Sequence, residues 1–207
     1  MDRSPRGTGP APVEFAASPW RAIAIAGGAA CAIALILLVT LRKRTEPGPE
    51  GERLLRAQAA ANEASAACAL KEILVAQNMY RRTDWDRDGV MEYAVPFTLL
   101  YGQKDSNGYA VRYISGDLAR AASRGAPLRG YWFVDMRGHQ AAGAYRSGGN
   151  QPDAFGVCAV PAAYPKSGRL TLIMDATGAV YGKDNGGVPV VAFPASPRAA
   201  GWSVSAR

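Results

Sequence analysis

The sequence predicts an α+β fold in which an N-terminal transmembrane helix precedes a long helix packed on an antiparallel four-stranded meander. Three observations predict it: a long uncharged apolar run near the N-terminus, helical spacing of apolar residues after it, and short apolar segments between turns in the C-terminal half. They divide the chain into a disordered tail, an anchor, a basic Pro/Gly linker and one globular domain, at residues 1–19, 20–41, 42–51 and 52–207.

The membrane anchor is predicted from the run at residues 22–41, which contains no charged residue. A helix of about 20 apolar residues spans a hydrocarbon core of roughly 30 Å. Trp20 precedes the run at the position where interfacial aromatic residues collect. Alanine recurs at every fourth position from Ala22 to Ala34. This spacing allows two anchors to associate into a homodimer, although alanine-rich anchors also show it by chance.

The charge pattern argues against a nucleic-acid partner. The formal net charge is +7. The basic residues of the globular part are scattered, whereas nucleic-acid surfaces cluster Lys and Arg with stacking aromatic residues. The basic run at residues 42–44 lies beside the anchor and suits anionic lipid headgroups.

A long helix is predicted from Glu52 to Arg81, and a short one over residues 116–124. The long helix presents one face at alternating four- and three-residue spacing: Ala66, Leu70, Ile73, Gln77 and Tyr80. Apolar segments between turns predict the strands at residues 130–135, 154–160, 170–174 and 179–182. The tail at 186–202 contains several prolines and is expected to run extended along the domain surface.

The spaced acidic residues Asp84, Asp86, Asp88 and Glu92, with Gly89 at the sixth position, resemble the first part of an EF-hand loop. Calcium is therefore the one cofactor that the sequence suggests. The twelfth position is Val95 instead of a bidentate Glu. The other interpretation is an Asp-Gly turn after the long helix, whose acids accept hydrogen bonds from backbone amides.

The cysteines leave a second question open. Cys31 lies in the predicted anchor, whereas Cys68 and Cys158 lie in the globular part. The latter pair could form a disulfide in an oxidising compartment. The alternative is two small buried side chains, since free cysteine is among the most buried residue types.

No catalytic motif is recognisable, whether a phosphate-binding glycine loop, a zinc-protease helix or a serine nucleophile turn. An anchored enzyme would need a site in the long stretch at residues 137–153. Its candidate residues there and beside it are Asp135, His139, Tyr145 and Asp153.

A family resemblance rests on segments of the long helix at residues 62–66, 69–73 and 77–80, and on later segments at 86–94, 130–133, 155–161 and 178–184. Together these segments resemble bacterial envelope domains related to type IV pilins and type II secretion pseudopilins. The resemblance implies the fold and an envelope location, but no reaction. The chain lacks the leader peptide of pilins and has a Pro-Gly break after Arg44, so it is not expected to polymerise into a filament.

The topology has conflicting signals. More Lys and Arg follow the anchor than precede it, which favours a cytoplasmic domain. The resemblance, the cysteine pair and a weak calcium loop favour the extracytoplasmic side of the inner (cytoplasmic) membrane. We therefore expect a noncatalytic, single-pass envelope protein whose domain binds another envelope protein or a cell-wall polymer. The alternatives are an anchored enzyme or a calcium-stabilised structural module.

Overall fold

The computed structural model of the chain describes residues 48–85, 89–104, 110–140, 143–144 and 154–205. The chain divides into two compact units, residues 1–49 and 50–207, and almost all described residues belong to the second. The predicted anchor at 20–41 lies outside the described residues, so it stays a prediction. Among the residues that the structure does describe, no helix is long and apolar enough to cross a membrane.

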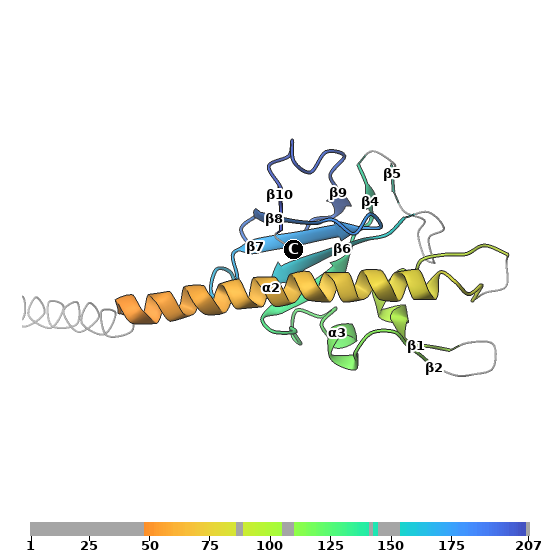
Figure 1. Ribbon diagram of the computed structural model, residues 1–207, viewed down its shortest axis with the longest axis horizontal. Coiled ribbons are helices and arrows are strands. Elements are labelled where there is room, and N and C mark those ends of the chain that lie inside the picture. The colour runs from red at the N-terminus through yellow and green to blue at the C-terminus, as the bar shows by residue number, and fades with distance from the viewer. Residues whose placement is uncertain (1–47, 86–88, 105–109, 141–142, 145–153, 206–207) are drawn as a thin grey trace, which may run out of the picture. The chain divides into compact units, whose positions relative to one another are not determined.

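The long helix, α2, spans Pro49–Tyr80 and lies across one face of the sheet (Figure 1). It begins within the segment that was predicted to be a linker. Proline is tolerated in a first helical turn because its missing N–H would have no helical partner there, and acidic side chains at Glu50 and Glu52 suit the helix N-terminus. The predicted face is confirmed, because every member is buried: Ala66, Leu70, Ile73, Gln77 and Tyr80.

The sheet is larger than the predicted four-stranded meander. It has five antiparallel strands in the order β10-β8-β7-β6-β3. Four of them occupy the expected places: β3 (Tyr131–Asp135), β6 (Gly156–Pro161), β7 (Leu170–Asp175) and β8 (Val180–Asp184). The fifth, β10 (Ser203–Val204), forms where the C-terminal segment returns and pairs with Tyr181 and Gly182 of β8. The prediction of four strands is therefore wrong.

Both faces of the sheet are buried. Side chains of β3, β6 and β7 alternate between a core shared with α2 and a second, smaller core on the other face. Phe193 and Trp202 of the C-terminal segment lie in the second core. The tail was expected to run along the surface, but it covers the second face, so β6 is buried at every position.

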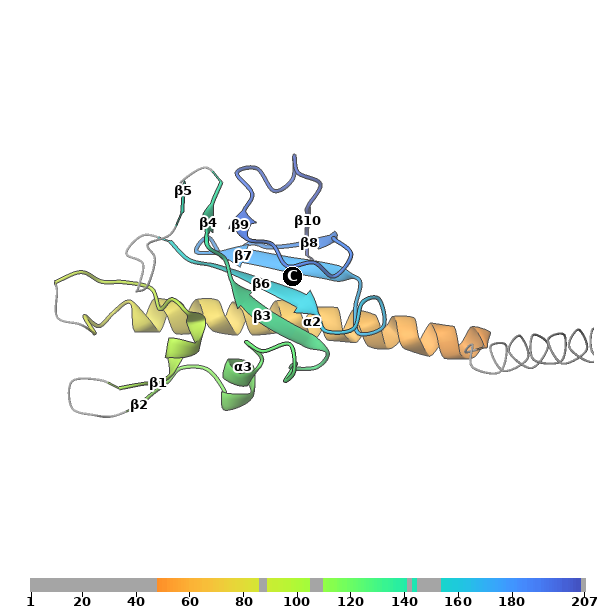
Figure 2. The same ribbon diagram turned by 180° about the vertical axis from the view of Figure 1, so that it is seen from behind.

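Smaller elements complete the domain on either side of the sheet. They are η1 (Phe97–Leu100), the hairpin of β1 (Tyr101–Lys104) and β2 (Ala110–Arg112), and the short helix α3 (Gly116–Arg120). Figure 2 shows α3 on the side of α2 where β3 lies. A small sheet contains β4 (Gly138–His139), β5 (Gly143–Ala144) and β9 (Ala192–Phe193). The short helix predicted at 116–124 is helical over its first part only.

Polar side chains of α2 join the helix to the chain around it. The Asn62 Nδ2 atom donates to the Ser167 carbonyl at 2.8 Å. The Glu63 carboxylate accepts from the amides of Arg169 and Leu170, at the start of β7, at 2.8 and 3.1 Å. Because hydrogen bonds to charged groups are roughly twice as strong as neutral ones, these contacts help to fix α2 on the sheet.

Candidate functional site

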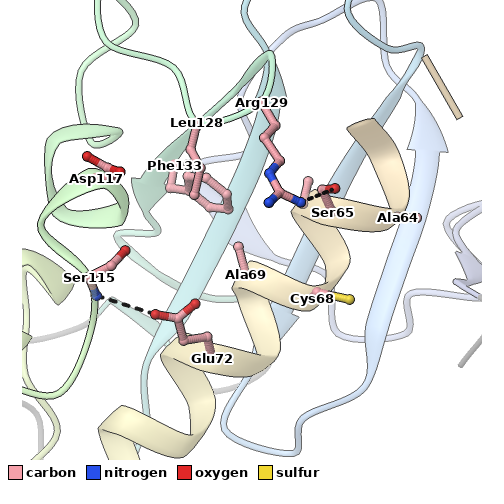
Figure 3. Close-up of a pocket in the computed structure, with 11 residues that line it drawn as sticks. Ala64, Ser65, Cys68, Ala69, Glu72, Ser115, Asp117, Leu128, Arg129 and Phe133 are labelled. Carbon is pink, nitrogen blue, oxygen red and sulfur yellow. Dashed lines mark hydrogen bonds between the residues drawn. The ribbon is translucent and has the colours of Figure 1, made fainter. Parts of the chain in front are cut away.

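A groove runs along one side of α2, between that helix and the chain that carries α3 and the start of β3 (Figure 3). Its volume is about 480 Å³. Volumes of about 300–1,000 Å³ are usual for small-ligand pockets. We refer to it as the α2 groove. It is lined by Ala64, Ser65, Ala66, Cys68, Ala69, Glu72, Ser115, Asp117, Leu128, Arg129 and Phe133.

The centre of the α2 groove is apolar because small residues of the helix face larger ones across it. Ala66 and Ala69 are 3% and 6% exposed. Leu128 and Phe133 lie opposite the helix (Figure 3). Both alanines are buried, whereas Ala64 is exposed and Leu128 is half-buried, so these two residues give the groove accessible apolar surface.

Charged groups stand at different places along the α2 groove. The Arg129 Nη1 atom donates to Ser65 Oγ at 3.3 Å, and Glu72 Oε1 accepts from the Ser115 amide at 3.4 Å. Figure 3 shows these two pairs, with Ala69 between them along the helix. The Asp117 carboxylate, farther from α2, accepts a hydrogen bond from Arg120. Arg129 forms no ion pair within the described ranges.

Arg129 occupies the first position of a tight two-residue turn that leads into β3. The amides and carbonyls of Leu128 and Tyr131 exchange hydrogen bonds at 2.8 and 3.0 Å. Between them, Arg129 has φ +47° and Gly130 has φ +80°. A hairpin turn with two positive φ angles strongly favours Asn, Asp or Gly at its first position. Arginine is therefore held in an unfavourable backbone conformation.

The predicted calcium ligands are only partly within the described residues. Asp84 Oδ2 accepts from the Gly89 amide at 2.9 Å, which is the backbone contact expected of an Asp-Gly turn. Glu92 is buried, whereas Asp86 and Asp88 lie outside the described residues. No group of metal-ligating side chains forms among the residues described. The calcium hypothesis stays a prediction.

The predicted Cys68–Cys158 disulfide is not formed, and both residues are free thiols. Their positions explain this. Cys68 is exposed on α2, whereas Cys158 is buried in the second core. Val157 and Ala159, which flank Cys158 in its strand, face α2, so the Cys158 side chain points to the opposite side of the sheet.

Of the four residues considered for an enzymatic site, the structure describes Asp135 and His139, and these two lie on opposite faces of the sheet. Asp135 Oδ1 accepts from the Phe97 amide at 2.9 Å, beside the core shared with α2. His139 stacks on Phe193 at 5.3 Å and belongs to the other face. Its Nε2 atom is 3.9 Å from Asp175 Oδ2. Tyr145 and Asp153 lie outside the described residues. The sequence interpretation missed Asp175, which no motif marks, and Arg129, whose one local signal is its place with Gly130 just before a strand.

Maleimide is expected to modify Cys68 in the folded protein and to leave Cys158 unmodified. Burial raises the pKa of the Cys158 thiol to about 12, and Val190 N–H donates to its sulfur at 3.4 Å. Thiolate is the reactive form. Peptide mapping by mass spectrometry, with and without guanidinium chloride, measures the modification of each residue. A Cys68 peptide that reacted only after reduction would show instead that this thiol is paired.

Comparison with known proteins finds one family. A family model described as "Protein of unknown function (DUF2950)" matches residues 48–192, which is more than half of the chain. No curated protein matches. No solved structure matches either.

Proposed function

This chain belongs to the DUF2950 family of proteins of unknown function, and from that premise we propose that it is a noncatalytic, membrane-anchored envelope protein that binds a partner through the α2 groove. The anchor is the segment at 20–41, which contains the apolar run at 22–41, and the domain lies on the extracytoplasmic side. The resemblance to pilin-like envelope domains supports this location.

The α2 groove is the observation that carries the binding role. It combines an apolar floor with an arginine that has no carboxylate partner among the described residues. Ligand sites have this composition: mostly apolar walls and a few polar groups that fix the orientation of the ligand. The enzyme alternative has less support, because Asp135 and His139 lie on opposite faces of the sheet.

The binding role can be tested by site-specific photo-crosslinking in living cells. A photoreactive amino acid at position 68 lies in the α2 groove, and one at position 191 lies beside the second face of the sheet. Both positions are exposed. We expect a discrete crosslinked product from position 68 that is absent from position 191. Identical products from both positions, or none from position 68, would overturn the binding role.

The proposed extracytoplasmic location of the domain can be tested separately. A membrane-impermeant maleimide is expected to label Cys68 in intact cells, because this thiol is exposed and the domain is proposed to face outward. A Cys68→Ser variant is the control for labelling elsewhere in the chain. Labelling of Cys68 that requires lysis of the cells would place the domain in the cytoplasm and refute the envelope location.

A further inference from the structure

We propose that the ligand of the α2 groove is a short peptide with a carboxylate at one end and an ammonium group at the other. Arg129 binds the carboxylate, and Glu72 binds the ammonium group. This inference rests on the proposed binding role of the groove and adds the chemical class of the ligand.

The conformation of Arg129 points to a ligand. The turn at 128–131 would be more stable with Asn or Gly in place of Arg129, since its φ angle is +47°. Among the described residues, the guanidinium group has one hydrogen bond, the 3.3 Å bond to Ser65 Oγ. Residues that break a local structural rule without a compensating contact are expected at functional sites. The guanidinium group has five N–H donors, so several are left for a carboxylate, which it can bind in bidentate geometry.

The spacing of two positions on α2, Ser65 beside Arg129 and Glu72, indicates the length of the ligand. The Arg129 guanidinium group is hydrogen-bonded to Ser65 of α2. Glu72 lies farther along the same helix. Ser65 and Glu72 are about two helical turns apart, or roughly 10 Å along the axis at a rise of about 1.5 Å per residue. An extended peptide spans about 3.3–3.6 Å per residue, so a tripeptide places its two ends at this separation.

The charges and walls between these points also fit a peptide. Glu72 is exposed, and its hydrogen bond to the Ser115 amide is long, which leaves its carboxylate able to bind an ammonium group. Asp117 also lines the groove, but its charge is offset by the ion pair with Arg120, so Glu72 is the acidic group assigned to the ammonium end. Ala64 and Leu128, the exposed and half-buried apolar residues that line the groove, can contact small apolar side chains of the ligand. A ligand with only one kind of charge would leave Arg129 or Glu72 without an oppositely charged group.

Calorimetric titration of the full-length protein in detergent micelles tests the inference with trialanine as the probe. We expect trialanine to bind, and both its C-terminal amide and its N-acetyl form to bind about tenfold or more weakly, which is the loss of one charge-assisted pair. Dialanine is expected to bind more weakly because it cannot reach both groups. Trialanine with a D-alanine C-terminus distinguishes a cell-wall source from a protein source of the peptide. Equal affinity for trialanine and its two blocked forms would overturn the inference.

Variants separate ligand recognition from a structural role. Arg129→Asn is expected to abolish the preference for a carboxylate while raising the melting temperature by about 2–4 °C, because asparagine suits the turn. A purely structural arginine would lower the melting temperature when replaced. Glu72→Gln is expected to abolish the preference for an ammonium group. Arg124→Asn, at an exposed arginine outside the groove, is the matched control and keeps both preferences.

The two proposals fail in different ways. If position 68 crosslinks a partner in cells but trialanine does not bind, the ligand class is wrong and the binding role stands. If trialanine binds to Arg129→Asn as it does to the wild type, the assignment of the carboxylate to Arg129 is refuted. If position 68 yields no product and trialanine does not bind, both proposals fall.

Discussion

Replacing Gln77 with leucine is expected to lower the free energy of unfolding by about 3 kcal/mol, because it leaves two buried backbone groups without partners. Gln77 is 0% exposed on α2. Its Nε2 atom donates to the Ala94 carbonyl at 2.7 Å, and its Oε1 atom accepts from the Ala94 amide at 2.8 Å. Ala94 is also fully buried. Water therefore cannot replace the lost hydrogen bonds.

Urea denaturation measures this effect, and Gln58→Leu is its matched control. Gln58 lies on the exposed side of the same helix and donates to Asn62. Its replacement is expected to cost less than about 1 kcal/mol. Hydrogen exchange adds a local measure, because the Ala94 amide should exchange faster in Gln77→Leu. Similar losses of stability in both variants would show that the link between Gln77 and Ala94 does not hold this segment.

Gln77 shows what periodicity can and cannot predict. The spacing of the helix face placed Gln77 correctly among the buried residues. The helix face alone cannot show why a polar residue belongs there. The reason is a backbone segment after the helix, whose buried amide and carbonyl need partners.

The sheet was likewise only partly predictable from the sequence. Apolar segments between turns predicted the four longest strands, because a buried strand must be apolar over most of its length. β10 could not be predicted in this way, since its two residues pair with β8 and both are exposed. The surface position expected for the tail was wrong for a related reason. Phe193 ends a short apolar run that prolines interrupt, Trp202 is an isolated apolar residue, and periodicity does not detect such contacts with a distant sheet.

The α2 groove could not be predicted because its walls come from distant parts of the sequence. Ser65 and Arg129 are 64 residues apart and meet only in the folded domain. One local signal was present, since Arg129-Gly130 immediately precedes a strand. A glycine at the second position of such a turn is common, but an arginine at the first is not. An unusual residue in a recognisable turn was therefore the available indication of a site.

The protein is expected to lose stability between about pH 4 and about pH 7 because of Asp135, a carboxyl group at the end of β3. Burial raises its pKa from 3.8 to about 6, and the hydrogen bond from the Phe97 amide acts in the opposite direction. The folded state thus binds a proton more tightly than the unfolded state. The stability that this tighter proton binding contributes is fully present below the pKa of Asp135 in the unfolded chain. It is lost as the pH rises through the pKa of Asp135 in the folded protein. The difference between the two pKa values corresponds to at most about 3 kcal/mol of stability. Solvent screening lowers this figure where water reaches the carboxyl group.

Asp135→Asn separates this effect from the other titrating groups. Asparagine keeps a carbonyl oxygen that can accept from the Phe97 amide, and it cannot ionise. Urea denaturation at several pH values should therefore show equal stability for wild type and variant at about pH 4, and a more stable variant at about pH 7. Asp184→Asn is the control. The pKa of the exposed Asp184 is lowered by hydrogen bonds from the Gly186 amide and Arg169, so this change should not reduce the loss of stability at higher pH. If Asp135→Asn is no more stable than the wild type at neutral pH, the Asp135 carboxylate must be solvated there, and the end of β3 must be more open to water than its contact with Phe97 implies.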